Sequence, residues 1–217
     1  MTDYTGDVTP GGPAAVRDLT GLTVTKVSVG PMDNNAYLLR CRHDGSQVLI
    51  DAANEPGRLL ELIGPDLSAV ITTHRHGDHT GALAEVVGAT GAESLAHADD
   101  AAEIPVVTRT LADGDTVPVG DCTLEVIHIV GHTPGSIVLA YHDPAGTAHL
   151  FTGDSLFPGG VGNTRGNKRN FESLIGDVET KLFGRFGDDT WFYPGHGKDS
   201  TLGRERPAVP EWRARGW

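Results

Sequence analysis

The segment THRHGDHT, residues 73–80, places three histidines and one aspartate within six consecutive residues. The apolar run Ala69–Thr73 leads into it and is typical of a buried strand. The residues that follow, Gly81–Val87, are predicted to continue as a helix. Loops at strand ends carry binding and catalytic side chains more often than the strands themselves do. We therefore predict that this polar segment links a buried strand to a helix and forms part of a functional site.

The order of these four polar residues favours a metal site. In an extended segment, residues two apart point to the same side, so His74 and His76 can turn toward one point. Asp78 and His79 lie where the helix is expected to begin and can face a neighbouring point. Imidazole and carboxylate ligands without cysteine suit Zn²⁺ best, and also iron or manganese. The segment therefore predicts ligands for a divalent cation.

Three later loops carry residues of the same chemical kind. They are GHTPGS at residues 131–136 with His132, TGDS at residues 152–155 with Asp154, and PGHG at residues 194–197 with His196. Glycine or proline borders each of them, which suits tight turns that aim a side chain. Five of the ten histidines fall in these loops and the first segment together. Seven ligands are too many for one tetrahedral ion, whereas two ions about 3.5 to 4 Å apart that share a carboxylate would use all of them.

The rest of the chain alternates between strand and helix patterns. The further predicted strands are Leu22–Val29, Ala36–Cys41, Gln47–Asp51, Thr116–Val119, Thr123–Val130, Ser136–Tyr141, Ala148–Phe151 and Thr190–Tyr193. Residues 54–63 are predicted to form a short helix, because asparagine can cap a helix and proline is tolerated in its first turn. Asn170–Phe183 repeats apolar residues at three- and four-residue steps, which predicts an amphipathic helix with Asn170 as its cap. Strands interleaved with helices place the chain in the α/β class.

Length and composition narrow the possible classes of protein. The 217 residues suffice for one sizeable domain, which we assign to residues 21–217. Residues 1–20 lack an apolar stripe and are expected to form a flexible arm. The net charge of −12 argues against nucleic acid as a partner. Because neither a secretory signal nor an apolar run of membrane-spanning length is present, we expect a cytoplasmic protein. Cys41 and Cys122 stand alone and are interpreted as reduced thiols.

Together with the three later loops, the segment at residues 73–79 resembles the metal-binding motifs of the metallo-β-lactamase superfamily, over about Leu22–Arg206. The resemblance implies an αββα sandwich, in which two mixed β-sheets pack face to face, helices lie outside and the metals sit at one edge. It also implies the ligand roles: His74, His76 and His132 for the first metal, Asp78, His79 and His196 for the second, and Asp154 as the bridge. Asp51 matches the family's first motif and would orient a ligand, although a turn carboxylate at a strand end is the other interpretation.

Details within these motifs favour one branch of the superfamily. Asp154 stands where many true β-lactamases of this fold carry cysteine, and His76 stands where the oxygen-reducing diiron members carry a carboxylate. Residues 152–162, 193–197 and 200–206 are similar to short bacterial glyoxalase II-type enzymes. This resemblance implies a hydrolase in which a metal-bound hydroxide attacks a thioester of a 2-hydroxy acid. Asp78 and Asp154 would be its catalytic residues, and an anionic thioester would be its small-molecule partner.

The chain departs from the longer glyoxalase II enzymes in two places. It ends about twenty residues after His196, without their C-terminal helical region. It also has Asn163-Thr164 where they place a basic residue, which leaves the carrier thiol open. Three other interpretations stay open: a persulfide dioxygenase with a single iron, a lactonase or other ester hydrolase, and a non-catalytic metal-binding module. The oligomeric state is not predicted.

The candidate substrate-binding residues follow the Asp154 loop. They are Phe157, Asn163, Arg165, Lys168 and Arg169. The three cations lie just before a predicted helix, where positive charge is unfavourable to the helix dipole. We expect one of them to meet a carboxylate or phosphate on the carrier thiol; a solvated loop of no functional consequence is the other interpretation.

Overall fold

The N-terminal half of the chain forms a mixed sheet of seven strands. The computed structural model describes residues 4–216 and orders this sheet β1-β2-β3-β4-β5-β6-β7. The strands are β1 (Ala15–Asp18), β2 (Leu22–Val29), β3 (Asn34–Cys41), β4 (Gln47–Ile50), β5 (Leu67–Ile71), β6 (Glu93–His97) and β7 (Arg109–Leu111). Strands β1 to β4 pair antiparallel, whereas β4 to β7 pair parallel.

The C-terminal half forms a second sheet of six strands in the order β15-β14-β11-β10-β9-β8. The strands are β8 (Thr116–Val119), β9 (Cys122–His128), β10 (Ile137–His142), β11 (Ala148–Gly153), β14 (Trp191–Pro194) and β15 (Ser200–Thr201). All neighbours pair antiparallel except β11 and β14, which pair parallel. A separate hairpin of β12 (Leu156–Phe157) and β13 (Gly160–Val161) follows β11.

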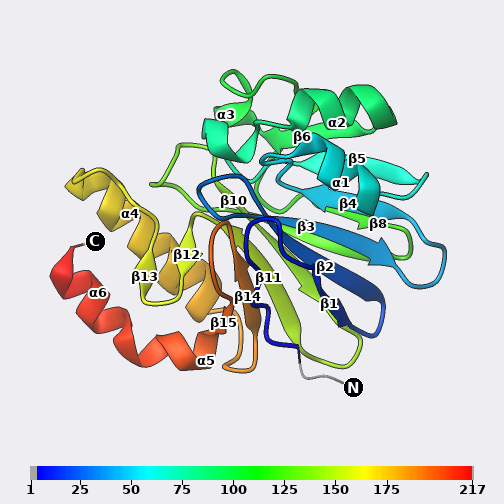
Figure 1. Ribbon diagram of the computed structural model, residues 1–217. Helices are drawn as coiled ribbons and strands as arrows, with labels where there is room; N and C mark the ends of the chain where they lie inside the picture. The colour runs from blue at the N-terminus through cyan, green and yellow to red at the C-terminus, as the bar shows by residue number, and fades with distance from the viewer. Residues whose placement is uncertain (1–3, 217) are drawn as a thin grey trace.

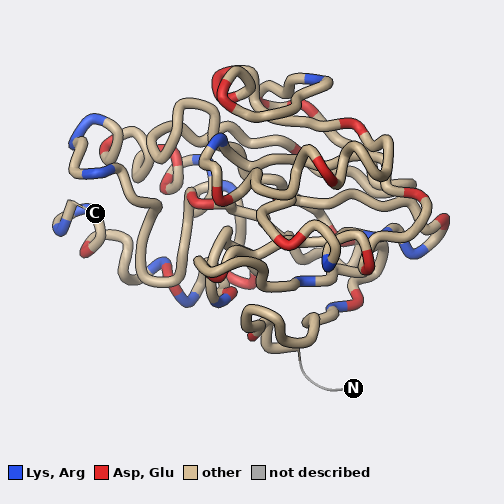
Figure 2. Tube along the Cα trace, turned by 45° about the horizontal axis from the view of Figure 1, so that its top comes forward, with Lys and Arg blue, Asp and Glu red and all other residues tan. Residues whose placement is uncertain are grey.

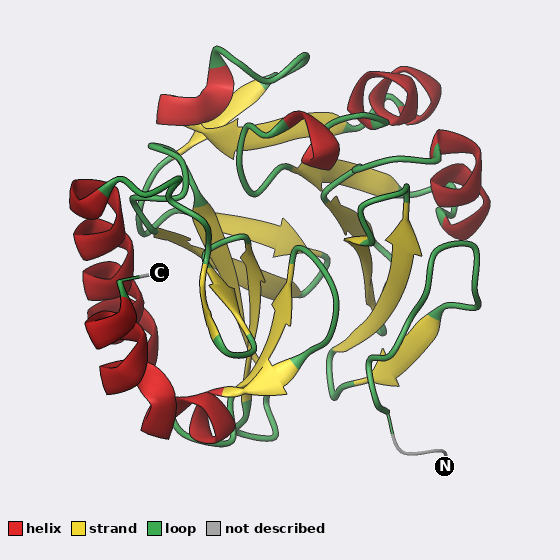
Figure 3. Ribbon diagram, turned by 60° about the vertical axis from the view of Figure 1, so that its left-hand side comes forward, coloured by secondary structure: helices red, strands yellow, loops and turns green. Residues whose placement is uncertain are grey.

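Helices flank the two sheets, which pack face to face (Figures 1 and 3). The first sheet carries α1 (Pro56–Leu62), α2 (Leu83–Thr90) and α3 (Ala98–Ala101), and the short η1 (Gly77–His79) follows β5. The second carries α4 (Lys168–Asp177), the π-helical η2 (Val178–Phe183), α5 (Leu202–Glu205), η3 (Arg206–Ala208) and α6 (Val209–Arg215). The predicted αββα sandwich is therefore confirmed. Within residues 4–216, every helix is too short or too polar to cross a membrane.

Apolar side chains fill the space between the sheets and the space under the helices. Strand β9 illustrates the arrangement, because Leu124 and Val126 face the cluster between the sheets while Ile127 faces the cluster under α4. Successive residues of a strand point to opposite faces, so one strand serves both layers. Full burial of such a side chain stabilises the fold by about 1.5 to 3 kcal/mol. The two sheets thus form a rigid platform for the loops at their ends.

The expected flexible arm at residues 1–20 is wrong for its last part. Ala15–Asp18 form β1 and pair with β2, from Ala15 opposite Lys26 to Asp18 opposite Thr23. The edge of β2 supplies backbone hydrogen bonds to this segment, so it can form a strand without a strong apolar pattern. Residues 1–3 of the expected arm lie outside the described residues.

The predicted helix at residues 170–183 is present but begins earlier and changes type. It starts as α4 at Lys168 and continues as η2 from Val178. Asn170 as the cap is wrong, because the side chain of Asn167 accepts a hydrogen bond from the backbone N–H of Asn170. Asn167 has the extended backbone that a capping residue needs, whereas Asn170 lies within the first turn.

Candidate metal centre

Loops from both sheets meet at one edge of the sandwich. The segment after β5 supplies the first four predicted ligands, and the turn between β9 and β10 supplies His132. Asp154 follows β11 and His196 follows β14, which are parallel neighbours in the second sheet. Because the carboxyl ends of parallel strands lie at the same edge of a sheet, residues far apart in the sequence come together here.

Three histidines form the first ligand group. Nδ1 of His76 lies 3.0 Å from Nε2 of His74 and 2.9 Å from Nε2 of His132. The three ligand atoms are close enough to hold one metal ion. Three ring nitrogens that converge on one point suit a shared cation, because a neutral imidazole offers a lone pair to a metal ion.

Asp78, His79 and His196 form the second group. Nε2 of His79 lies 3.2 Å from Nε2 of His196, and Oδ2 of Asp78 lies 3.3 Å from the same His196 nitrogen and 3.5 Å from that of His79. These three atoms can likewise hold one metal ion. These two triads are the groups that the resemblance implied, and His74, His79 and Asp154 form a further group that overlaps both.

The carboxylate of Asp154 lies between the two triads. Its Oδ2 is 3.4 Å from Nε2 of His132 and 3.9 Å from Nε2 of His74. Its Oδ1 is 3.4 Å from Nε2 of His79, and this oxygen is buried without a hydrogen-bond partner among the described residues. A buried carboxylate oxygen without a partner is costly unless a cation satisfies it. This donor set fits a pair of divalent ions.

Several of the histidine and aspartate side chains at the centre are held in orientation by hydrogen bonds to polar groups outside the two triads. Nδ1 of His132 donates to the carbonyl of Asn163, and Nδ1 of His196 donates to the carbonyl of Met32, both at 2.9 Å. Each hydrogen bond leaves Nε2 of the same ring as a lone-pair donor toward the centre. Asn34 also donates from Nδ2 to Oδ2 of Asp78 at 2.9 Å.

The predicted supporting residue Asp51 is buried beside His79. Its Oδ2 accepts hydrogen bonds from Nδ1 of His79 and Oγ1 of Thr73, each at 2.8 Å, and its Oδ1 accepts one from the Thr73 backbone at 2.7 Å. The backbone of Asp51 adopts a left-handed conformation with φ 56°, which is strained for a residue other than glycine. The strained backbone of Asp51 and its hydrogen bond to His79 favour the interpretation that Asp51 orients a ligand over the interpretation that it is an ordinary turn residue.

The surroundings of the centre favour a neutral His74 and an ionised Asp154, as ligands require, but they favour a protonated His79. Burial lowers the pKa of His74 well below its usual value, and the neighbouring His79 lowers it further. Burial opposes ionisation of Asp154, but its interaction with the neighbouring His79 outweighs burial and lowers the pKa of Asp154 strongly. Burial also opposes the charge of His79, yet Asp51 and Asp154 raise its pKa to about 10. A cation that binds at His79 must therefore displace a proton.

Close packing explains one of the glycines in these loops. A Cβ atom on Gly195 would lie 2.3 Å from Oδ1 of Asp154 and 2.7 Å from the His79 ring. No side chain fits in that space, so glycine before His196 lets the two sheets approach each other at the centre.

The sequence did not reveal several residues that hold the ligand loops. Asp100 is buried, and its carboxylate accepts hydrogen bonds from the backbones of Arg75 and Gly135 and from the hydroxyl of Thr133. It thereby ties the loop of His76 to the loop of His132. Asp100 lies within an otherwise unremarkable ADD stretch, and the sequence carries no motif that would have identified it.

The structure brings only some of the predicted substrate-binding residues to the centre. The Phe157 ring lies 6.3 Å from that of His196, and the Asn163 carbonyl holds His132. Arg165 is close enough for its charge to contribute to the lowered pKa of His76, for which burial is the main cause. Lys168 instead lines a separate cavity of about 360 Å³ with Arg213 and Arg215. Arg169 is exposed on α4.

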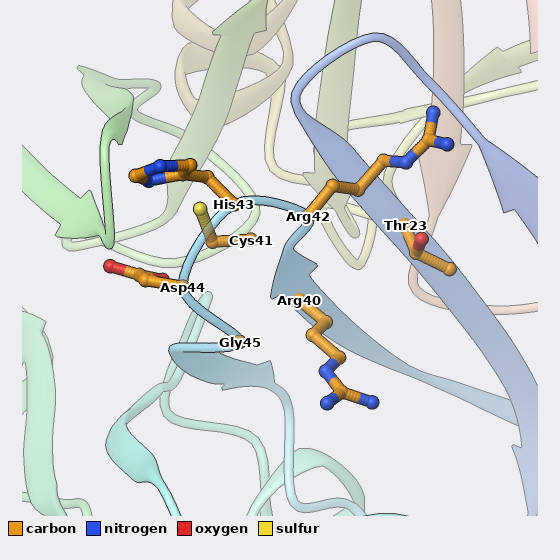
Figure 4. A pocket seen from close by; sticks show the side chains of 7 residues that line it. All are labelled: Thr23, Arg40, Cys41, Arg42, His43, Asp44 and Gly45. Carbon is orange, nitrogen blue, oxygen red and sulfur yellow. The ribbon is translucent and has the colours of Figure 1, made fainter.

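Of the other surface hollows, one is lined in part by His132 and lies beside the centre, whereas others lie away from it. One of about 440 Å³ surrounds the turn between β3 and β4 and is lined by Thr23, Arg40, Cys41, Arg42, His43, Asp44 and Gly45. Figure 4 shows that the side chains of Arg40, Arg42 and His43 point in different directions. They do not converge on a common point, so this hollow does not form a second candidate site.

Comparisons with known proteins agree with the geometry. A hydroxyacylglutathione hydrolase from Rhodospirillum rubrum is 39% identical over 152 residues, which cover 69% of this chain and 56% of that protein. The hydroxyacylglutathione hydrolase GloC from Haemophilus influenzae is 30% identical over 184 residues, which cover 75% of this chain and 85% of that protein. The solved structure of TTHA1623 in a di-iron-bound form is similar with a TM-score of 0.67 and 30% identity, covering 83% of this chain and 96% of that one.

The first of these relatives is much longer than the matching region, since the chain spans little more than half of its length. The family model of the metallo-β-lactamase superfamily matches residues 29–202. These residues run from the end of β2 to the start of α5 and include all seven predicted ligands. The chain therefore belongs to the metallo-β-lactamase superfamily.

Proposed function

We propose that this chain is a metal-dependent hydrolase of thioesters formed by 2-hydroxy acids. The observation that carries the proposal is the pair of ligand triads with Asp154 between them, in a chain whose relatives are named hydroxyacylglutathione hydrolases. Cysteine takes no part in the ligand set, in keeping with a hydrolase that differs from the cysteine-containing β-lactamases.

The ligand geometry supports two divalent ions. His74, His76 and His132 would hold one ion, and Asp78, His79 and His196 would hold the other, with Asp154 contacting both. The di-iron-bound form of the similar solved protein supports this number. Nitrogen and oxygen ligands suit Zn²⁺ best, and iron or manganese also fits them. When bound, such ions lower the pKa of a coordinated water and polarise a carbonyl oxygen.

The chain's own side chains would orient the reactants. Carboxylate oxygens of Asp78 and Asp154 face the centre and can accept hydrogen bonds from the attacking water, which fixes its direction. Asn34 holds Asp78 in place, and Asp51 holds His79. A thiolate is a good leaving group, so the reaction requires little general-acid catalysis, and none of these residues needs to protonate it.

The two flanks of the centre differ in character, which bears on how the substrate lies. Phe157 offers an apolar surface beside His196, whereas Arg165 brings a positive charge toward His76. We assign Arg165 to an anionic group of the substrate and Phe157 to its carbon skeleton. Asn163 would act through its backbone carbonyl, which holds His132.

Hydrolysis of S-D-lactoylglutathione by the purified, zinc-loaded protein tests the proposal. We expect release of free thiol, loss of activity after chelation and recovery after zinc is restored. The zinc-loaded protein is also assayed with S-lactoylcysteamine and with an acyl lactone. An iron-loaded preparation is assayed separately for oxygen uptake with glutathione persulfide. Oxygen uptake with a single iron and no thioester hydrolysis would favour the persulfide dioxygenase interpretation and contradict the proposal. Faster lactone than thioester turnover would contradict the substrate class.

A further inference from the structure

A lysine lies buried on the face of β2 that meets the second sheet. Lys26 follows Leu22 and Val24 on that face, and its side chain is 0% exposed. Its Nζ donates to Oδ1 of Asp199 at 2.6 Å, to the carbonyl of Gly197 at 2.7 Å and to the carbonyl of Gly6 at 2.8 Å. All three ammonium hydrogens therefore have partners, which is the condition under which a buried lysine is tolerated.

The N-terminal segment covers this charged pair from the outside. The hydroxyl of Tyr4 donates to Oδ2 of Asp199 at 2.9 Å, and its ring packs edge-on against Trp191 and Tyr193. Gly6 has φ +69°, and a Cβ atom there would lie 2.0 Å from Oδ2 of Asp199. Figure 1 shows the N-terminal segment, in dark blue, passing β14 and β15. Residues 4–6 thus complete the hydrogen bonding of the Lys26–Asp199 pair.

The same pair anchors the loop that carries a predicted ligand. Gly197 directly follows His196, and Asp199 lies just before β15. Asn35 adds further contacts from the first sheet: its Nδ2 donates to the Gly197 carbonyl at 3.0 Å and its backbone N–H donates to the Gly195 carbonyl at 2.7 Å. The carbonyls on both sides of His196 are therefore held by residues of the opposite sheet.

We propose that Tyr4, Gly6, Lys26 and Asp199 are positioning residues for His196, and that through this loop they set the affinity of the metal position formed by Asp78, His79 and His196. The inference rests on the ligand role given to His196 in the proposed function, but not on the identity of the substrate. Removing one partner of a buried ion pair leaves an uncompensated charge that pulls in water. The loop would then shift at His196, while the triad of His74, His76 and His132 keeps its own supports.

Stepwise metal affinity tests this directly. Zinc and Co²⁺ titrations against a competing chelator give two dissociation constants, and the visible absorption of Co²⁺ reports each position separately. Tyr4→Phe keeps the ring and removes one hydrogen bond, so we expect about tenfold weaker binding of one equivalent, since loss of an outer partner costs about 10- to 100-fold. Deletion of residues 2–6 should weaken the same equivalent by about 100-fold. His196→Ala identifies which equivalent that is.

Tyr193→Phe is the matched control. It also removes a buried hydroxyl, but that hydroxyl contacts Arg17 and His149 and makes no hydrogen bond to the Asp199 loop. It should keep both dissociation constants within about twofold, even if both Tyr→Phe variants have a lower melting temperature than the wild type. Equal effects of the two Tyr→Phe variants, or a deletion variant that binds both equivalents as tightly as the wild type, would overturn the proposal. A wild-type protein with two zinc positions but no thioester hydrolysis would sink the proposed function and leave this inference standing.

Discussion

Most imidazoles of the metal centre have a polar partner behind the ring, and Asp154 connects the two groups of ligands. Its Oδ1 is the buried carboxylate oxygen at the centre that lacks a hydrogen bond among the described residues. The Asp154 carboxylate also brings negative charge to a site crowded with histidines, and it lies within 4 Å of ring nitrogens from both triads. Its charge therefore matters more to cation binding than its shape does.

Asp154→Asn keeps the size of the side chain and removes this charge. We expect turnover of a thioester to fall by at least about 100-fold, because two cations lose their common anionic ligand. Metal analysis and steady-state kinetics of the purified variant check this. Wild-type metal content together with wild-type turnover would contradict the bridging role.

Arg165 and Lys168 offer a matched pair of cations for testing substrate recognition. Arg165→Ala should raise KM for an anionic thioester by about twofold to fivefold, since exposed ion pairs contribute about 0.2 to 1 kcal/mol. The effect should shrink at high salt, which screens the wild-type attraction. Lys168→Ala should change KM little, because Lys168 lines a different cavity. Equal KM values for all three proteins would assign both cations to the solvated surface.

His149 makes the stability of the fold depend on pH. Burial and the nearby Arg17 lower its pKa from 6.5 to about 4, although Asp143 and Asp189 act in the opposite direction. The pKa of His149 is lower in the folded state than in the unfolded state. Its contribution to the free energy of unfolding is therefore complete above pH 6.5 and is lost as the pH falls toward 4. Neutral His149 can accept a hydrogen bond from Tyr193, 3.0 Å away, and the protonated ring cannot.

The wild type should lose about 2 kcal/mol of unfolding free energy between pH 7 and pH 5 through His149 alone. His149→Asn lacks the titrating group, so its free energy of unfolding should fall less over this interval. Urea unfolding of both proteins at the two pH values measures the difference. An equal loss of unfolding free energy in the two proteins would contradict the prediction, because it would mean that His149 has the same protonation state in the folded and the unfolded protein.

Sequence motifs indicated the candidate ligands and the supporting residue Asp51, but not the other residues that hold the ligand loops. The seven predicted ligands lie in short loops bordered by glycine or proline, where histidine and aspartate in a fixed order are informative. Asn34 contacts a residue 44 positions away and Lys26 one 173 positions away. In an alternating strand a lysine is expected to be exposed. Only the packing of the second sheet against the first makes Lys26 a buried residue.

The secondary-structure elements with the clearest apolar patterns were predicted most accurately from the sequence. Strands β2 and β8 have the predicted bounds, since their alternation is clear and both ends are marked by turn residues. Strand β6 was not predicted, because its sequence ESLAH is polar at three of five positions. Ser94 is nevertheless buried there, with its hydroxyl donating to the carbonyl of Val106. Partners of this kind come from tertiary structure and leave no periodic pattern.

The cap of α4 gives a test at the level of the element. Asn167→Ala should lower the free energy of unfolding by about 1 kcal/mol, because the Asn170 backbone N–H loses its acceptor. Asn170→Ala, at the position expected from the sequence, should change it by less than about 0.5 kcal/mol. Chemical denaturation of the two variants compares them. A larger loss in Asn170→Ala would restore Asn170 as the cap.

On the scale of the whole molecule, each sheet supplies an incomplete set of ligands. The first sheet contributes His74, His76, Asp78 and His79, and the second contributes His132, Asp154 and His196. Neither triad is complete without the other sheet. Figure 2 shows acidic and basic positions interspersed along the chain trace. The centre therefore links the two halves of the sandwich.

The number of zinc ions bound per chain tests this two-position centre most directly. Equilibrium dialysis against excess zinc, followed by elemental analysis, should give two equivalents for the wild type. His76→Ala, in one triad, and His196→Ala, in the other, should each retain about one equivalent. Chelator competition should assign the missing equivalent to a different position in each variant. One equivalent or fewer in the wild type, or unchanged zinc content in either variant, would contradict the centre described here.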